Sequence, residues 1–437
     1  MRNNKAEKYP KILVISNNAF SETSNNGKTL ASFFKEFPKE RVAQLYFNNE
    51  FPDDNDYYNY YRITDKEMLK SKVSNQGPGR TVQVPQKNKN INKVSGKSLL
   101  IKFKKSNISR ILRELLWMNS RWETDSLDQW LNQFSPEIVF LCAGDSGFAY
   151  DISNKIKSKF DAKLIVYITD DYILPRKSIS LFWWIRRNYI FTKMKHTVQQ
   201  SDLFITISKE MRNTYKELFK VDSFLAMNMT TSLHRKDIIK SGNKNKIILI
   251  YAGGLHFNRY KTLHLLSKAI HEFNQKSYGR KAFLKIYSGA KPDEKIKKYL
   301  NIEDASEFYG YLNGEDLIKE LNSCDIPVHV EAFDSKSIES TKLSISTKIP
   351  EYLSLKKPVL AIGPSRVASM NYLKESAYCI TEIKQISTKL QEFLNNDELK
   401  LELAKKAAEQ YDENHNSETA LQKLLQLINS INSPNNI

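Results

Sequence analysis

Short apolar runs of strand length alternate with segments of helical periodicity along almost the whole chain. In the first half, the apolar runs cover residues 12–16, 42–47, 138–142, 164–168 and 203–207. Helices are expected between them over residues 28–37, 148–160, 179–198 and 209–219. Such alternation is typical of parallel α/β units, because parallel strands need long crossover connections and helices cover the faces of the sheet. The pattern therefore predicts a doubly wound α/β fold.

A second series of the same kind follows the polar segment HRKDIIKSGNKNK, which we interpret as a linker between domains. Its apolar runs cover residues 247–252, 283–287, 326–330 and 359–362. A chain of 437 residues also exceeds the size at which a single core keeps growing. We predict Rossmann-like domains over residues 1–235 and 236–410, and a helical tail over residues 411–437. Residues 51–124 break the rhythm and are predicted to form an irregular insertion.

Charge and cysteine content limit the class of protein. Lys and Arg outnumber Asp and Glu by 67 to 49, and the net charge of +18 favours anionic lipid, phosphorylated substrates or nucleic acid as partners. Three cysteines, Cys142, Cys324 and Cys379, argue for a reducing compartment without a disulfide framework. No signal peptide precedes the first strand, and no run of 18 apolar residues is present. We expect a cytoplasmic protein, soluble or peripheral on the inner face of the cytoplasmic membrane.

The segment 344–364, SISTKIPEYLSLKKPVLAIGP, combines a helix with a buried strand that ends at Gly-Pro. Ser346 or Thr347 can cap the helix, and residues 359–362 have the composition of a strand covered on both faces. Glu351 then lies near the carboxyl edge of the sheet, where open α/β folds bind small ligands. A carboxylate there can accept hydrogen bonds from a pair of sugar hydroxyls. The alternative is a solvated helix glutamate, since charged side chains are usually exposed.

Glycine turns follow the first strand of each series. Gly27 stands in NNGKT, but the glycine that a Walker A loop requires five residues earlier is Glu22, so we reject a P-loop NTPase. Gly254 follows the strand 247–252, and Arg259 and Lys261 come shortly after it. Glycine lets backbone amides approach an anion, and fixed cations stabilise the negative charge of a diphosphate. The alternatives are ordinary β-to-α turns and a chance pair of cations in a basic chain.

Two such domains, with YAGGLHFNRYKTL opening the second and STKIPEYLSLKKPVLAIGP near its end, resemble the retaining GT-B glycosyltransferases of family 4, the group 1 type of bacterial surface-polysaccharide synthesis. The resemblance implies two doubly wound Rossmann-like domains facing across a cleft. It implies transfer of a sugar, with retention, from a nucleoside diphosphate sugar to a glycan or lipid-linked glycan acceptor. We expect neither a metal nor a cofactor.

The resemblance also assigns roles on the donor side. It implies that Gly27 and Gly254 lie at the donor phosphates. It implies that Arg259 and Lys261 clamp the diphosphate and that Glu351 binds the nucleotide ribose.

The sequence departs from the family pattern at two places. The family has a second glutamate eight positions before the ribose residue, but Leu343 stands there. Glu331 or Glu339 could substitute, and we prefer Glu331 because it ends a predicted strand. Many relatives carry a sugar-binding histidine in the first domain, but none occurs before residue 196, so Asp145 in a Gly-Asp-Ser-Gly turn is the best polar candidate. We therefore predict Asp145 and Glu331 as the catalytic contacts.

Two other features of the first domain concern the acceptor side. Asp170 and Asp171 follow a predicted strand and either face the acceptor or form an ordinary turn. The segments 97–117 and 179–194 combine aromatic and basic residues, which suits an anionic membrane surface. Alternatively, the second of these segments is partly core.

Three other functions remain open at this stage. A catalytically silent GT-B partner subunit would explain Leu343 and the missing histidine. A nucleotide-sugar epimerase has a similar build, but it uses a histidine near the sugar. A nucleic-acid-binding protein would explain the charge, yet no nucleic-acid-binding motif is recognisable and we expect no nucleic-acid partner.

Overall fold

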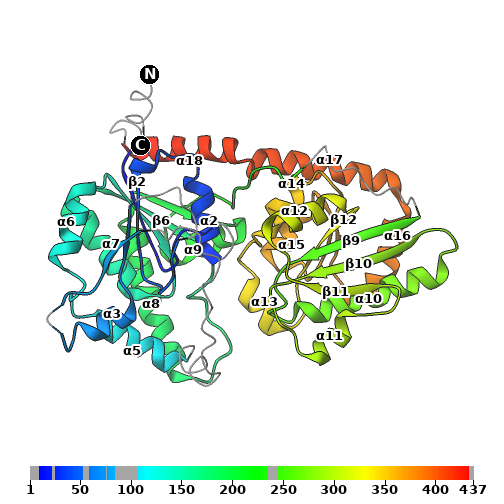
Figure 1. The fold of residues 1–437 in the computed structure, drawn as a ribbon, viewed down its shortest axis with the longest axis horizontal. Coiled ribbons are helices and arrows are strands. Elements are labelled where there is room, and N and C mark those ends of the chain that lie inside the picture. Colours follow the sequence, from blue (N-terminus) through cyan, green and yellow to red (C-terminus); the bar gives the residue numbers. More distant parts are fainter. Residues whose placement is uncertain are drawn as a thin grey trace. The chain divides into compact units, whose positions relative to one another are not determined.

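The computed structural model describes residues 9–21, 25–52, 59–74, 76–83, 106–234 and 245–432. These residues divide into two compact units, each built around a mainly parallel sheet with helices on its faces (Figure 1). The first unit draws on Met1–Ile207, Met211–Leu225 and Leu424–Ile437, and the second on Ser208–Glu210 and Ala226–Lys423. The predicted fold class, two doubly wound α/β domains, is confirmed.

The sheet of the first unit has eight strands in the order β4-β3-β2-β1-β5-β6-β7-β8. All neighbouring strands are parallel except β3 and β4. Strands β1 and β5 are buried along their whole length, which explains their continuous apolar sequences. The strands are β1 (Ile12–Ser16), β2 (Val42–Tyr46), β3 (Tyr60–Arg62), β4 (Arg80–Val82), β5 (Ile138–Ala143), β6 (Lys163–Ile168), β7 (Leu203–Thr206) and β8 (Phe224–Leu225).

Helices of the first unit begin where the sequence supplies caps. The Ser106 side chain accepts a hydrogen bond from the Ser109 amide at the start of α5, and Thr124 does the same for the Leu127 amide at α6. Helix α5 packs against α8. The helices are α2 (Asn25–Phe34), α3 (Asp65–Lys70), α5 (Asn107–Trp117), α6 (Asp125–Phe134), α7 (Gly147–Phe160), α8 (Leu181–Gln199) and α9 (Lys209–Phe219), with the short η1 (Lys39–Arg41).

The second unit has a six-stranded parallel sheet in the order β11-β10-β9-β12-β13-β14. Its strands are β9 (Lys246–Ala252), β10 (Lys281–Tyr287), β11 (Ser306–Gly310), β12 (Ile326–Val330), β13 (Val359–Ile362) and β14 (Ala377–Ile380). Its helices are α10 (Arg259–Lys276), α11 (Glu294–Leu300), α12 (Gly314–Ser323), α13 (Ser335–Thr341), α14 (Lys348–Ser354), α15 (Ala368–Leu373), α16 (Ile386–Asn395) and α17 (Asp397–Asn414), with the short η2 (Ile383–Gln385). The last helix, α18 (Ser417–Asn432), is grouped with the first unit from Leu424 onward.

Three local predictions need correction. The first helix begins at Asn25 instead of residue 28, so Gly27 lies in its first turn. The predicted irregular insertion contains β3, α3, β4 and α5 in its described part, and the rest of it lies outside the described residues. Strands β11 and β14 were missed because they are short edge strands, and β11 exposes alternate side chains.

Candidate functional site

The order of the strands marks one position in each sheet where a ligand can bind. In the second unit the chain runs outward from β9 to β10 and then returns to the other side of β9 as β12. In the first unit the same reversal separates β1 from β5. Ligands of open α/β sheets bind outside the carboxyl ends of the strands at such a reversal. The residues after β9, β12, β1 and β5 are therefore the first to consider.

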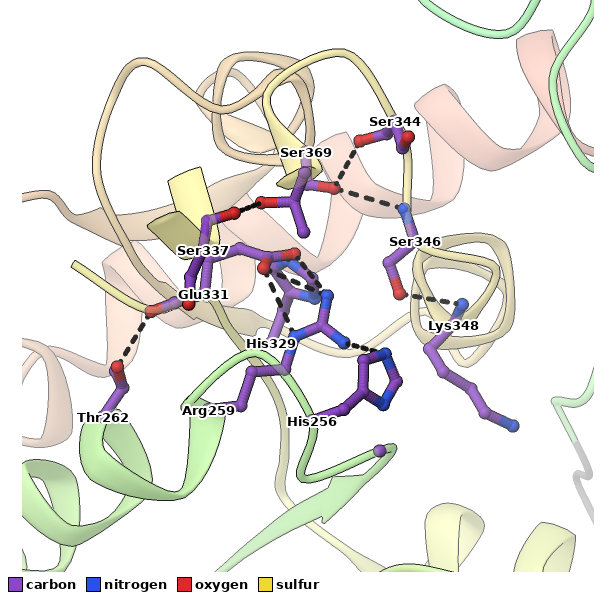
Figure 2. Close-up of polar contacts among 12 residues, drawn as sticks. His256, Arg259, Thr262, His329, Glu331, Ser337, Ser344, Ser346, Lys348 and Ser369 are labelled. Atoms are coloured by element: carbon purple, nitrogen blue, oxygen red, sulfur yellow. Dashed lines mark hydrogen bonds and ion pairs between the residues drawn. The ribbon is translucent and has the colours of Figure 1, made fainter. Parts of the chain in front are cut away.

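At the second sheet, Arg259 and Glu331 form a two-pronged ion pair (Figure 2). Arg259 is the first residue of α10, and Glu331 directly follows β12. The Arg259 Nη2 atom lies 3.0 Å from each carboxylate oxygen of Glu331, and Nε lies 3.2 Å from Oε2. The Thr262 hydroxyl donates to the Glu331 carbonyl oxygen at 2.8 Å. The guanidinium is therefore held in one orientation at the start of a helix.

Glu331 is buried but remains charged. Its side chain is 2% exposed, and the Nε2 atom of His329 lies 3.3 Å from its Oε1. Burial acts to raise the pKa of Glu331, but His329 and Arg259 outweigh it and hold the pKa below its ordinary value. In turn Glu331 outweighs the effect of burial on Arg259 and keeps the pKa of that guanidinium raised. A carboxylate bound in this way orients Arg259 and is a poor nucleophile.

Gly254 makes room for a histidine beside this pair. A Cβ atom at Gly254 would lie 2.3 Å from Nδ1 of His256, so any side chain here would displace the imidazole. The Nε2 atom of His256 lies 3.3 Å from Nη1 of Arg259. Burial and the adjacent Arg259 lower the pKa of His256, so the ring is neutral at pH 7. His256 thus joins the polar cluster of Arg259 and Glu331 (Figure 2).

Lys261 lies in the first turn of α10, exposed to solvent. Its charge is near Asp334 and helps to hold the pKa of that carboxyl low, although burial acts in the opposite direction. Asp334 accepts a hydrogen bond from the Asn258 side chain at 3.0 Å and caps α13. The diphosphate role of Lys261 stays a prediction.

Glu351 lies on α14, which is fixed to the end of β9. The Tyr352 hydroxyl bonds to both the amide and the carbonyl of Ala252, each at 3.0 Å. Glu351 is buried, and Lys348 Nζ lies 2.9 Å from its Oε2 atom. The alternative of a solvated helix glutamate is thus excluded. Thr347 is the N-cap residue of this helix but makes no side-chain cap hydrogen bond.

Leu343, at the position of the second family glutamate, is buried and only 5% exposed. The structure thus offers no carboxylate at residue 343. Glu339, the other candidate substitute, lies on α13 and is half-buried. Of the two candidates, Glu331 is the one that ends a strand at the reversal point.

In the first unit, the carboxyl ends of β1 and β5 line a polar pocket of about 210 Å³. Asparagine side chains dominate the lining, together with Arg113 and Asp145. Gly144 leaves space for Asn17, whose Nδ2 would lie 2.8 Å from a Cβ atom at residue 144. The lining residues are Ser16, Asn17, Asn18, Asn26, Asn48, Arg113, Cys142, Gly144, Asp145 and Tyr172.

Asp145, predicted as a catalytic contact, is paired with two arginines. Its Oδ2 atom lies 2.7 Å from Arg186 Nη2 and 3.0 Å from Arg110 Nη1. Arg113 on α5 is close by and donates to the Ser146 hydroxyl at 2.8 Å. Sequence reasoning assigned these arginines to a membrane surface. Their partner lies 41 residues from Arg186 in the sequence, so no local pattern could reveal the cluster.

Glu114 caps the helix that follows Asp145. Its two carboxylate oxygens accept hydrogen bonds from the amides of Gly147 and Phe148 at 2.9 and 3.1 Å. Burial raises the pKa of Glu114 to about 7 despite these two donors. Glu114 therefore caps the N-terminus of α7, and its carboxyl group also interacts electrostatically with Arg113 and Arg186.

Gly27 and Asp171, two other residues singled out in the sequence, each have a structural role. A Cβ atom at Gly27 would lie 2.1 Å from the Ala19 carbonyl oxygen, so glycine lets α2 pack on the loop after β1. Asp171 accepts hydrogen bonds from the amides of Ile173 and Leu174, at 3.0 and 2.9 Å, which is ordinary turn chemistry. The donor role of Gly27 and an acceptor role of Asp170 stay predictions.

Within the described ranges, no group of three or more His, Cys, Asp or Glu side chains could hold a metal ion. None of the helices in those ranges is long and apolar enough to cross a membrane.

A family model matches part of the chain within the second unit, and solved structures match almost the whole chain. Residues 234–410 match the family model described as glycosyl transferases group 1. The chain is similar to HepE of Anabaena in complex with UDP-glucose, with a TM-score of 0.55 and 12% identity over 96% of this chain and 99% of that one. It is similar to a glycosyltransferase from Rickettsia africae, with a TM-score of 0.59 and 12% identity over 97% and 99% of the two chains.

A third similar structure is the α,α-trehalose-phosphate synthase (UDP-forming) from Burkholderia xenovorans in complex with glucose-6-phosphate. Its TM-score is 0.59, with 10% identity over 95% of this chain and 100% of that one. No curated protein matches the chain in sequence. At these identities, the likeness to the solved structures concerns the fold.

Proposed function

We propose that this chain, a glycosyltransferase of GT-B fold whose residues 234–410 belong to the glycosyl transferases group 1, transfers a sugar from a nucleoside diphosphate sugar to a glycan or lipid-linked glycan acceptor. The observation that carries the proposal is the cluster at the reversal point of the second sheet. There a fixed guanidinium, Arg259, and a buried carboxylate, Glu351, lie on elements that both meet the end of β9.

The donor diphosphate binds at the start of α10. A helix of 18 residues presents a partial positive charge at its N-terminus. Arg259, ion-paired with Glu331, and Lys261 place two cationic side chains in the first turn. Glu351 binds the ribose hydroxyls, for which a buried carboxylate is a strong acceptor. The UDP-glucose complex of HepE supports a uridine nucleotide as the first donor to test.

The chemistry is departure of the diphosphate assisted by fixed cations. Arg259 and Lys261 stabilise the charge that develops on the leaving oxygen, and the amides of α10 add to this effect. Glu331 holds Arg259 and is not the nucleophile. The acceptor hydroxyl then attacks the anomeric carbon from the face that the diphosphate leaves and passes its proton to the departing phosphate oxygen, which gives retention of configuration. The cations of the chain take the place of a divalent metal in this scheme.

The acceptor belongs to bacterial surface-polysaccharide synthesis, and the protein works at an anionic membrane surface. Helix α5 supports this placement because its exposed face is apolar, while Glu114 and Trp117 on the other face are buried. The start of α8, which packs against α5, exposes further apolar side chains. The exposed apolar side chains are Ile108, Leu112, Leu115 and Met118, together with Ile179, Leu181, Phe182 and Ile185.

A catalytically silent partner subunit is the second candidate. The observation that favours it is the buried Leu343, which leaves no carboxylate where the family has its second glutamate. Such a subunit would bind the nucleotide without turning over the donor.

Calorimetry without divalent metal tests the proposal. A panel of nucleoside diphosphates and their sugar conjugates is titrated into the wild type, Glu351→Ala and the control Glu398→Ala, which removes an exposed glutamate of α17. We expect micromolar binding of one base, weakened at least about tenfold by Glu351→Ala alone, because the ribose loses hydrogen bonds to a charged group. Equal binding by all three proteins contradicts the ribose role, and binding of no nucleotide contradicts the proposed function.

A further inference from the structure

An arginine cluster beside the pocket of the first unit carries more positive charge than the carboxylates ion-paired with it, and of its three arginines Arg113 lines the pocket itself. Arg110 and Arg186 share a single carboxylate oxygen, Oδ2 of Asp145, at 3.0 and 2.7 Å. Arg113 is paired with Asp65 at 2.8 Å. Among the described residues, three guanidinium groups thus share two ion-paired carboxylates, and the third carboxyl nearby, Glu114, has its pKa raised by burial to about 7 and is only partly ionised at neutral pH.

The surplus charge is costly because Arg186 is buried. The residue is 7% exposed, and its Nε atom has no hydrogen-bond partner among the described residues. Burial lowers the pKa of Arg186, and Arg110 adds to that effect against the opposing charge of Asp145. A buried guanidinium with free donors is stabilised when an anion accepts from it.

The orientation of α5 supports the same conclusion. Arg110 and Arg113 lie one turn apart and both reach inward, to Asp145 and Ser146. Leu112 and Leu115 on the same helix are more than half exposed. An amphipathic helix normally buries its apolar face. Helix α5 instead directs Arg113 into the pocket and Arg110 to Asp145 on the pocket wall, which is the arrangement expected if these cations bind a ligand.

The pocket is large enough for a sugar-sized group. Its volume of about 210 Å³ corresponds to roughly seven water molecules at the liquid volume of about 30 Å³ each. Asparagines from the loops after β1 and β2 and from α2 supply neutral donors and acceptors for hydroxyl groups. Arg113 and Asp145 line the same space, so a bound anion and a bound sugar would be neighbours.

We propose that Arg110, Arg113 and Arg186 bind a phosphate group of the acceptor. The acceptor is then a sugar phosphate or a glycan joined through phosphate to a lipid. Asp145 holds Arg110 and Arg186 in place and is a positioning residue in this scheme. The assignment of this phosphate to the acceptor rests on the proposed function. The anion site itself is a property of the first unit alone.

Three soluble probes test the site: glucose 1-phosphate, geranyl diphosphate and neutral glucose. They are titrated into the wild type, Arg110→Gln and Lys193→Gln, the last of which removes an equal charge from an exposed pair on α8. Arg110 is 40% exposed, so its replacement should not unfold the protein. Arg186→Lys, which keeps the charge and loses the guanidinium fork, is the second variant.

We expect at least one phosphate probe to bind the wild type and to bind Arg110→Gln about tenfold or more weakly, with Lys193→Gln unchanged. Arg186→Lys should show a loss of the same kind. Binding of glucose 1-phosphate indicates a soluble sugar phosphate, and binding of geranyl diphosphate alone indicates a lipid-linked acceptor. Phosphate probes that bind no tighter than glucose, or equally to wild type and Arg110→Gln, overturn the inference.

The nucleotide panel separates this inference from the proposed function. Arg110→Gln should leave nucleoside diphosphate affinity unchanged, whereas Arg259→Gln should lower it and leave the phosphate probes unaffected. Nucleotide binding without phosphate-probe binding would refute only the anion site. Phosphate-probe binding without any nucleotide binding would refute only the proposed function.

Discussion

At the scale of single residues, the second unit holds the Arg259 guanidinium in place with the Glu331 carboxylate. Arg259 and Glu331 are 72 residues apart in the sequence and meet because β9 and β12 are neighbours in the sheet. Glu331 is able to approach closely because Gly363 follows the adjacent strand, where a Cβ atom would lie 2.8 Å from that of Glu331. The pair therefore depends on the sheet and not on a local motif.

The first prediction is that Arg259 and Glu331 act as a unit in donor binding. We expect Arg259→Gln and Glu331→Gln each to weaken nucleoside diphosphate binding about tenfold or more, because each removes the fixed guanidinium or its anchor. The double variant should be weaker by much less than the product of the two losses. Calorimetry measures the affinities, and multiplicative losses would show that Glu331 contacts the donor independently.

Gly27 carries a second prediction, which separates packing from ligand binding. Gly27→Ala should lower the free energy of unfolding by about 1–3 kcal/mol, because its Cβ atom would overlap the Ala19 carbonyl oxygen. The control is Gly279→Ala, where a Cβ atom meets nothing within 4 Å. Urea unfolding measures both, and an equal stability of the two variants would contradict the packing role.

At the scale of elements, the sequence predicted α5 as part of a membrane-surface segment but did not predict that its arginines reach inward. Ile108, Leu112 and Leu115 recur with helical spacing, which ordinarily predicts a buried face. Here all three are exposed, while Glu114 is buried against α7. The choice of face depends on the partners of Arg110 and Glu114, and those partners lie more than 30 residues away.

The exposed face of α5 gives a third prediction. We expect Leu112→Gln together with Leu115→Gln to weaken binding to vesicles of anionic lipid about tenfold or more, because two side chains no longer enter the interface. Stability should hardly change, since both leucines are exposed in the free protein. Leu401→Gln on α17, also an exposed leucine, is the control for a general effect of polarity. Vesicle co-sedimentation unaffected by the paired change would exclude this face as the membrane contact.

The end of α17 contains a buried neutral histidine. The Nδ1 atom of His415 lies 2.8 Å from the Asn228 carbonyl oxygen, and Nε2 lies 2.7 Å from the Tyr372 hydroxyl. Burial lowers the pKa of His415 from 6.5 to about 4. The unfolded chain binds this proton more readily than the folded chain, so the stability contributed by neutral His415 is present above pH 6.5 and is lost as the pH falls toward 4.

The fourth prediction follows from the lowered pKa of His415, which makes the folded protein less stable at acidic pH. Between pH 7 and pH 4 the wild type should lose about 3 kcal/mol more of its unfolding free energy than His415→Gln, whose side chain does not titrate. Urea unfolding of both proteins at several pH values measures their unfolding free energies. The difference between the two proteins removes the contribution of the other titrating groups, which they share. Parallel pH profiles for the two proteins would contradict the buried neutral state.

At the scale of the whole molecule, sequence periodicity was enough to predict the class of fold. Long buried strands such as β1, β5 and β9 gave clear apolar runs, whereas β3 and β4 have three residues each and were missed. Gly254, Arg259 and Glu351 were predicted from motifs beside such strands, and the structure brings them to the end of β9. The arginine cluster and the pairing of Glu331 could not be predicted, because both arise only when distant segments meet.

The central claim is that a nucleoside diphosphate sugar binds at the reversal point of the second sheet. A crystal structure of the protein with the nucleoside diphosphate selected by the binding panel tests it most directly. The account predicts ribose hydroxyls within hydrogen-bond distance of the Glu351 carboxylate and phosphate oxygens within reach of the Arg259 guanidinium. A nucleotide bound elsewhere, for instance in the pocket of the first unit beside Asp145, would contradict it.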